Sequence, residues 1–147
     1  MSVLAAVVAG LSGAGVTAMA AYIALALAPT HAPVDVFYLM GSVFTRERGH
    51  ALVLGAALYL CAGVALAIGH ALLYQWFGLR TELVLWGLMS GFVQWLVLGA
   101  AAGAMRDGGM RQPGIFFGNM PGVTVVGFMA LHLLYGVVVG AVYEVVG

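Results

Sequence analysis

Charge is the property that this chain has least of. Only 7% of its 147 residues are charged, none is lysine, and five arginines balance five acidic residues. Soluble domains carry about 25% charged residues. A chain with so little charge cannot cover a water-facing surface, so we expect it to lie in lipid. The balanced charge also gives no basic excess for binding nucleic acid or a polybasic lipid patch.

Cysteine and catalytic motifs are almost absent as well. The single cysteine, Cys61, excludes an intramolecular disulfide and a cysteine-cluster metal site, and we interpret it as a small packing residue. The sequence contains no HExxH, P-loop, GxSxG or CxxC pattern. All acidic residues lie in connections or at the ends of apolar runs, so no carboxylate pair is expected at depth. We therefore predict neither an enzyme nor a metal site.

Long apolar runs dominate what is present. A helix of about 20 residues crosses about 30 Å of hydrocarbon, and four runs are long enough, near residues 3–27, 51–75, 83–105 and 123–146. The pattern predicts an all-α polytopic membrane protein, with residues 1–147 forming a single domain of four transmembrane helices in a bundle. The first run lacks the basic start and the short length of a cleaved signal peptide, so we interpret it as a span.

The distribution of arginine predicts an orientation. Four of the five arginines lie in the first and third connections and one in the second: Arg46, Arg48, Arg106, Arg111 and Arg80. Positive residues favour the cytoplasmic side. We therefore expect a multi-pass protein of the cell's inner (plasma) membrane, with the first and third connections in the cytoplasm and both termini outside.

The first connection is too apolar for an ordinary linker. Residues 34–44 are largely apolar, but 11 residues are too few to cross a bilayer. Pro33 suits a first helical turn, and Asp35 suits the dipole of that turn. The segment predicts a short helix lying in the membrane interface and ending before Arg46.

Small residues recur at four-residue spacing in the runs. Lipid tails are as apolar as leucine, so helices in membranes associate by close packing, which small residues permit. The candidate packing residues are Gly63, Gly87, Gly91, Gly99, Gly103, Gly136 and Gly140. Either these stripes meet one another inside one bundle, or at least one of them faces another subunit.

Two of the runs show an internal similarity. Residues 58–70 align with residues 131–143, and the alignment places Gly63 on Gly136. Both runs cross in the same direction, so a duplication would give a parallel repeat of two helical hairpins. The alternative is chance, because apolar helices of low complexity match each other readily.

Four polar residues fall at similar depth when each run is counted from its end at 1.5 Å per residue. They predict a polar layer across the bundle centre: Thr17, Tyr59, Gln94 and His132. A neutral His132 that hydrogen-bonds Gln94 or Tyr59 would join helices. A proton or ligand site, and a haem b ligand, are the alternatives for His132.

A haem held between two histidines does not fit this count. His70 and His132 are separated by about 15 Å along the membrane normal, so only His132 alone remains as an axial ligand. Other polar residues gather near the outer ends of the runs: His70, Glu82, Glu144, Tyr74 and Tyr143. We interpret them as ordinary interfacial residues, with a ligand site as the alternative.

Three segments carry a resemblance. GAGVTAM at 13–19, PVDVFYLMG at 33–41 and HLLYGVVVGAVYE at 132–144 are similar to segments of a family of small, uncharacterised bacterial four-helix integral membrane proteins. The first segment departs slightly from the family pattern GxxxTxxM. The resemblance implies the helix count and a recurring motif around His132. It implies no activity or substrate, because none is established for that family.

The leading functional hypothesis is a non-catalytic membrane subunit that packs within a larger membrane complex, such as a respiratory or photosynthetic one. Its partners would be the lipid bilayer and other membrane subunits or a second copy, with no nucleic acid. One alternative is a small homo-oligomeric transporter or channel that uses the mid-membrane polar residues. The other is an electron carrier that binds haem b through His132.

Overall fold

The computed structural model describes residues 2–28, 35–105 and 122–147, and within these ranges it contains five helices and no strand. The helices are α1 (Val3–Leu27), α2 (Val36–Ser42), α3 (Arg48–Trp76), α4 (Leu83–Met105) and α5 (Gly122–Val146). Four of them are long and apolar enough to cross a membrane. The structure therefore confirms the all-α class and the predicted spans to within three residues at each end.

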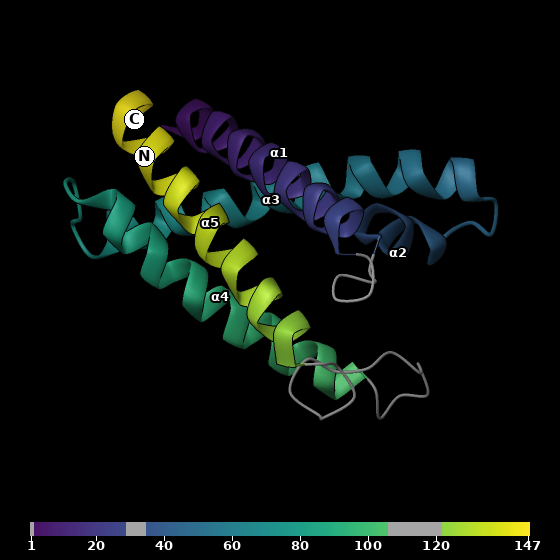
Figure 1. Ribbon diagram of the computed structural model, residues 1–147. Helices are drawn as coiled ribbons and strands as arrows, with labels where there is room; N and C mark the ends of the chain where they lie inside the picture. Colours follow the sequence, from purple (N-terminus) through teal and green to yellow (C-terminus); the bar gives the residue numbers. More distant parts are fainter. Residues whose placement is uncertain (1, 29–34, 106–121) are drawn as a thin grey trace.

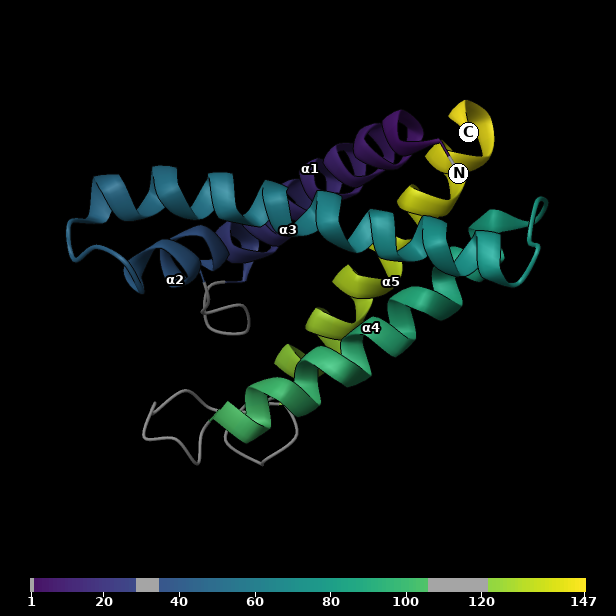
Figure 2. The same cartoon turned by 180° about the vertical axis from the view of Figure 1, so that it is seen from behind.

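The helices form an open bundle in which α1 and α5 occupy the middle. Helix α4 packs along α5, α1 packs against both α5 and α3, and α2 packs against α3, whereas α3 has few contacts with α4 and α5. Figure 1 shows α2 and the first half of α3 leading away from the lower ends of α4 and α5. The view from behind shows the same divergence, and both views place the two termini close together at one end (Figure 2).

Small residues fill the contacts between α4 and α5. A Cβ atom added at Gly87 would meet the carbonyl oxygen of Gly136, and one added at Gly91 would meet that of His132. An added Cβ at Gly140 would likewise strike the backbone of Leu83. The two helices therefore approach closely enough for backbone to touch backbone, which side chains at these positions would prevent.

The remaining candidate packing glycines lie in α3 and in the second half of α4. Gly63 faces α1, where an added Cβ would clash with the side chain of Ala14. Gly99 is buried in α4, whereas the surroundings of Gly103 lie outside the described part of that helix. The internal alignment pairs Gly63 with Gly136. Each of these glycines contacts the span before its own: Gly63 contacts α1, and Gly136 contacts Gly87 of α4. This is the arrangement expected of two equivalent hairpins, α1 with α3 and α4 with α5.

The large apolar side chains point outward rather than inward. Ala5, Ala6 and Ala9 are fully buried, whereas residues such as Leu4 and Val53 are more than 70% exposed. This inverted pattern is expected where the surroundings are as apolar as the core. Cys61 also points outward, because its thiol is exposed on α3. The prediction that Cys61 is a packing residue inside the bundle was therefore wrong.

Helix α2 confirms the short helix predicted in the first connection. Asp35 caps its start by accepting a hydrogen bond from the backbone N–H of Tyr38 (3.0 Å). The helix lies tightly on α3, because Gly41 contacts the backbone of Ala51 and Gly55 contacts the carbonyl of Phe37. Helix α2 is therefore docked onto the first half of α3.

The turn between α3 and α4 is fixed by Gly78. This residue has φ +67°, the left-handed conformation that glycine adopts at the end of many helices. The N–H of Leu79 donates to the carbonyl of Tyr74 (2.8 Å) and the N–H of Gly78 to that of Gln75 (3.2 Å), which satisfies the last carbonyls of α3. The short turn joins the end of α3 to the start of α4, at the end of the molecule where the two termini lie.

Candidate functional site

Thr17 and Tyr59, two members of the predicted polar layer, are in direct contact. The Thr17 hydroxyl lies 2.9 Å from the Tyr59 hydroxyl and also donates to the carbonyl of Gly13, at 2.8 Å in its own helix. Thr17 is almost completely buried. This pair links α1 to α3.

Gln94 lies near His70. Nδ1 of His70 and Oε1 of Gln94 are both buried without a hydrogen-bond partner in the described part of the chain. His70 is only 5% exposed, so this histidine is packed between helices and does not project freely from the end of α3.

His132 makes its hydrogen bond within α5. Its Nδ1 lies 2.8 Å from the carbonyl oxygen of Phe128, one turn earlier in the helix. Of the four residues predicted to form one layer, Thr17 and Tyr59 form a pair, and His132 is separate from them. The count along each span assumed helices parallel to the membrane normal, but α4 and α5 are inclined to α3 (Figure 1), which shifts the level of their residues.

A row of polar and aromatic side chains follows one face of α3. Tyr59, His70 and Tyr74 lie on this face together with Gly63, because their spacing places them on one side of a helix. Between them stands Tyr135 of α5, which donates a hydrogen bond to the carbonyl of Gly63. The His70 ring lies 5.9 Å from the Tyr135 ring and 6.2 Å from the Tyr74 ring, measured between centroids.

The row continues towards the start of α3, on which α2 packs. The Tyr59 ring lies 5.4 Å from Phe37, and Phe37 lies 5.1 Å from Tyr22. The Tyr22 hydroxyl donates to the Asp35 carboxylate at 2.6 Å. Phe37 is the one member of this stretch that has no polar group.

The row also reaches the opposite end, where the termini lie. The Tyr74 and Tyr143 rings are 6.0 Å apart, and the Tyr143 hydroxyl accepts a hydrogen bond from the backbone N–H of Ser2 (3.3 Å). The Tyr74 hydroxyl is buried and has no partner. We call the whole row the polar file, consisting of Asp35, Tyr22, Tyr59, Thr17, Tyr135, His70, Tyr74 and Tyr143.

The polar file has a definite chemical capacity. Phenol, hydroxyl and neutral imidazole groups each donate and accept hydrogen bonds. Successive groups of this kind can exchange partners and hand on a proton, and chains that contain histidine serve as proton relays in membrane pumps. Sequence reasoning missed Tyr135 and treated His70 and Tyr74 as end residues. The signal available was their shared helical face with Tyr59.

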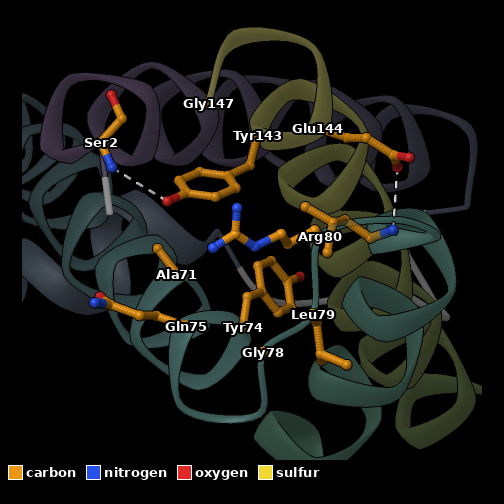
Figure 3. Close-up of a pocket in the computed structure, with 11 residues that line it drawn as sticks. Ser2, Ala71, Tyr74, Gln75, Gly78, Leu79, Arg80, Tyr143, Glu144 and Gly147 are labelled. Carbon is orange, nitrogen blue, oxygen red and sulfur yellow. Dashed lines mark hydrogen bonds between the residues drawn. The ribbon is translucent and has the colours of Figure 1, made fainter.

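A cavity of about 400 Å³ opens at the end of the polar file where the termini lie. Figure 3 shows the side chains of Tyr74, Arg80 and Tyr143 converging on it from the end of α3, the turn and α5. Glu144 borders the cavity and accepts a hydrogen bond from the backbone N–H of Leu83 (3.1 Å).

His70, Glu82 and Glu144 do not come together as the alternative of a ligand site at the outer ends would require. Glu144 is engaged at the start of α4, Glu82 is exposed in the turn, and His70 is buried one layer deeper. Across residues 2–28, 35–105 and 122–147, no cluster of three metal-ligating side chains occurs.

Searches of family models, of curated proteins and of solved structures found no match to this chain. The resemblance indicated by the three sequence segments therefore stays a prediction. The function has to be argued from the site itself.

Proposed function

We propose that this protein is a membrane transport protein that passes protons along the polar file. The observation that carries the proposal is the succession of these groups along α3. Side chains able to donate and accept hydrogen bonds follow one another from Asp35 beside α2 to Tyr143 beside the termini, with gaps at Phe37 and between Tyr59 and Tyr135.

Unpaired atoms in the polar file, and in Gln94 beside it, support a role beyond packing. The Nδ1 atom of His70, the hydroxyl of Tyr74 and the Oε1 atom of Gln94 are buried without a protein partner. Each unsatisfied polar group costs about 1–3 kcal/mol, so groups serving only to join helices would be expected in closed pairs, as Thr17 and Tyr59 are. A relay instead requires groups that are free to change partners.

His70 is the central group in the proposed path. Its ring can take up a proton at one nitrogen and release another from the second nitrogen. Tyr74 and Tyr143 continue the path towards the termini, and Tyr135 and Tyr59 continue it towards α2. The Phe37 ring separates Tyr59 from Tyr22, so passage to Asp35 requires this ring to move, which makes Phe37 the proposed gate.

The experiment compares two histidines of the same chain. Purified protein is reconstituted into liposomes that contain a pH-sensitive dye, and proton entry is driven by a potassium diffusion potential. We expect wild-type flux above that of empty liposomes, loss of that flux in His70→Gln, and wild-type flux in His132→Gln. His132→Gln is the matched control, since His132 bonds only within α5. Equal flux in wild type and His70→Gln, or none in either, refutes the proposal.

A subunit role in a larger membrane complex is the second candidate. It is favoured by the sparse contact between α3 and α4, whose outer faces carry exposed large apolar side chains such as Val53 and Val97. Native mass spectrometry after mild-detergent extraction from the native membrane tests it. Co-purified membrane proteins support a non-catalytic subunit, whereas a lone monomer or homo-oligomer contradicts that role.

A haem b site at His132 is the third candidate. The contact of Nδ1 with the Phe128 carbonyl leaves Nε2 for a ligand, and ligating histidines usually donate their other N–H to such a group. A Soret band in protein purified from haem-supplied cells, lost in His132→Gln, supports the site. Protein without that band contradicts it.

A further inference from the structure

The cavity beside the termini has the size of a small-ligand site. Its volume is about 400 Å³, and ligand sites in proteins measure about 300–1,000 Å³. The end of α3, the turn, the start of α4, the end of α5 and the first residues of the chain enclose it. It therefore lies at the ends of spanning helices, where lipid headgroups meet a membrane protein.

One positive and one negative side chain border this cavity. The Arg80 guanidinium points into it between Tyr74 and Tyr143 (Figure 3), and within the described part of the chain no acidic side chain lies at ion-pair distance from Arg80. At the edge of the cavity, the exposed Glu144 carboxylate uses one oxygen to accept from the N–H of Leu83. The cavity therefore presents two separate, opposite charges.

The hydroxyl of Tyr74 supplies a third polar group. Tyr74 is only 2% exposed, lines the cavity, and its hydroxyl has no hydrogen-bond partner in the protein. A buried hydroxyl without a partner is costly. The hydroxyl is closed off from the open part of the cavity, so an acceptor oxygen of a ligand satisfies it only when the exposed Arg80 side chain shifts.

We propose that this cavity binds the headgroup of a zwitterionic phospholipid, with phosphatidylethanolamine as the simplest example. The phosphate accepts hydrogen bonds from the Arg80 guanidinium, a favourable charge-assisted contact, and from the Tyr74 hydroxyl. The ammonium group of the headgroup meets the Glu144 carboxylate. A headgroup with one charge of each sign matches the cavity, whereas an anionic headgroup would face Glu144 with no compensating group.

The surface beside the cavity favours a lipid over a soluble phosphate. Trp76 and Phe77 stack on each other there at an interplanar angle of 18°, and they are 85% and 70% exposed. Aromatic side chains of this kind settle at the level of the headgroups. They would hold the end of α3 at the depth where a headgroup enters the cavity.

Lipid retention in native mass spectrometry tests this inference. Protein is exchanged into micelles that contain equal amounts of phosphatidylethanolamine and phosphatidylglycerol, and lipid adducts are counted on the folded protein. We expect the wild type to retain phosphatidylethanolamine preferentially, and Arg80→Gln and Tyr74→Phe to lose that adduct. Glu144→Gln, which keeps an acceptor for the N–H of Leu83, is expected to equalise the two lipids.

Arg48→Gln is the matched control, because Arg48 lies at the far end of α3, with its guanidinium 5.8 Å from the Tyr38 ring. It is expected to retain lipid as the wild type does. Equal retention of both lipids by the wild type, or unchanged retention in Arg80→Gln, overturns the inference. Displacement of the adduct by inorganic phosphate does so as well, because it assigns the cavity to a soluble anion.

The experiment is independent of proton transport. Arg80 is exposed in the turn, so its substitution leaves the fold intact even if Tyr74→Phe does not. The readout is a lipid mass rather than a flux, so either proposal can fail while the other stands.

Discussion

Gly87 and Gly136 touch through their backbones. A Cβ atom added to either residue would meet the carbonyl oxygen of the other. Because both obstacles are backbone atoms, a side chain at either position is accommodated only if α4 and α5 move apart. The contact between these helices is therefore sensitive to a single methyl group.

Gly136→Ala is expected to destabilise the protein, whereas Gly127→Ala in the same helix is not. Overpacking a tight contact costs about 1–3 kcal/mol. An added Cβ at Gly127 meets nothing within 4 Å, and replacing a helical glycine by alanine gains about 0.5–1 kcal/mol. Titration of both variants with SDS in mixed micelles measures the free energy of unfolding. Equal effects of the two substitutions would show that the α4–α5 contact is not the cause.

Gly78→Ala is expected to weaken the turn after α3. The left-handed conformation of Gly78, with φ +67°, costs other residues about 1–2 kcal/mol. The same SDS titration should show a loss of this size. Gly15→Ala in α1, where an added Cβ meets nothing within 4 Å, provides the reference. A neutral Gly78→Ala would mean that the turn adopts another conformation.

The Thr17–Tyr59 contact is expected to couple α1 to α3. Hydrogen bonds between helices in membranes contribute about 0.6 kcal/mol on average and up to about 1.7 kcal/mol. We expect Thr17→Val and Tyr59→Phe to be non-additive by an amount in this range, since either change removes the 2.9 Å contact. A double-mutant cycle of unfolding free energies measures the coupling, and full additivity would contradict it.

The orientation of the chain is open to a direct measurement. We propose an inner-membrane protein with both termini outside the cytoplasm, based on the arginine distribution. Alkaline phosphatase fused after Gly147 is then expected to be active, and a green fluorescent protein fused at the same position to be dark. The structure places both termini at one end (Figure 1), so a fusion before Ser2 should give the same result. The opposite pattern would reverse the orientation.

The lengths and positions of the spans followed directly from the sequence. Apolar runs of 23 residues or more leave few alternatives in lipid, because every backbone polar group must be satisfied within the helix. The largest discrepancy is the start of α3 at Arg48 instead of residue 51. A helix can continue beyond the hydrocarbon when its first turn carries polar side chains, and hydropathy alone does not mark that end.

The partners of the polar residues did not follow from the sequence. Depth along each run suggested that His132 bonds Gln94 or Tyr59, but the His132 ring bonds the Phe128 carbonyl of its own helix and Tyr59 bonds Thr17. Burial also depended on packing: His70 and Tyr74 lie near the end of an apolar run, yet Tyr135 and the neighbouring helices cover them.

The sequence by itself determined that the chain is a helical membrane protein, where its spans lie and which small residues allow close approach. These properties depend on hydrophobic length and residue size, which are local. Only the tertiary structure decided which glycines meet, which polar atoms stay unpaired and where a charged cavity forms. Those features depend on how the helices are inclined and rotated against one another, and small residues on several faces of each helix leave these angles undetermined by the pattern.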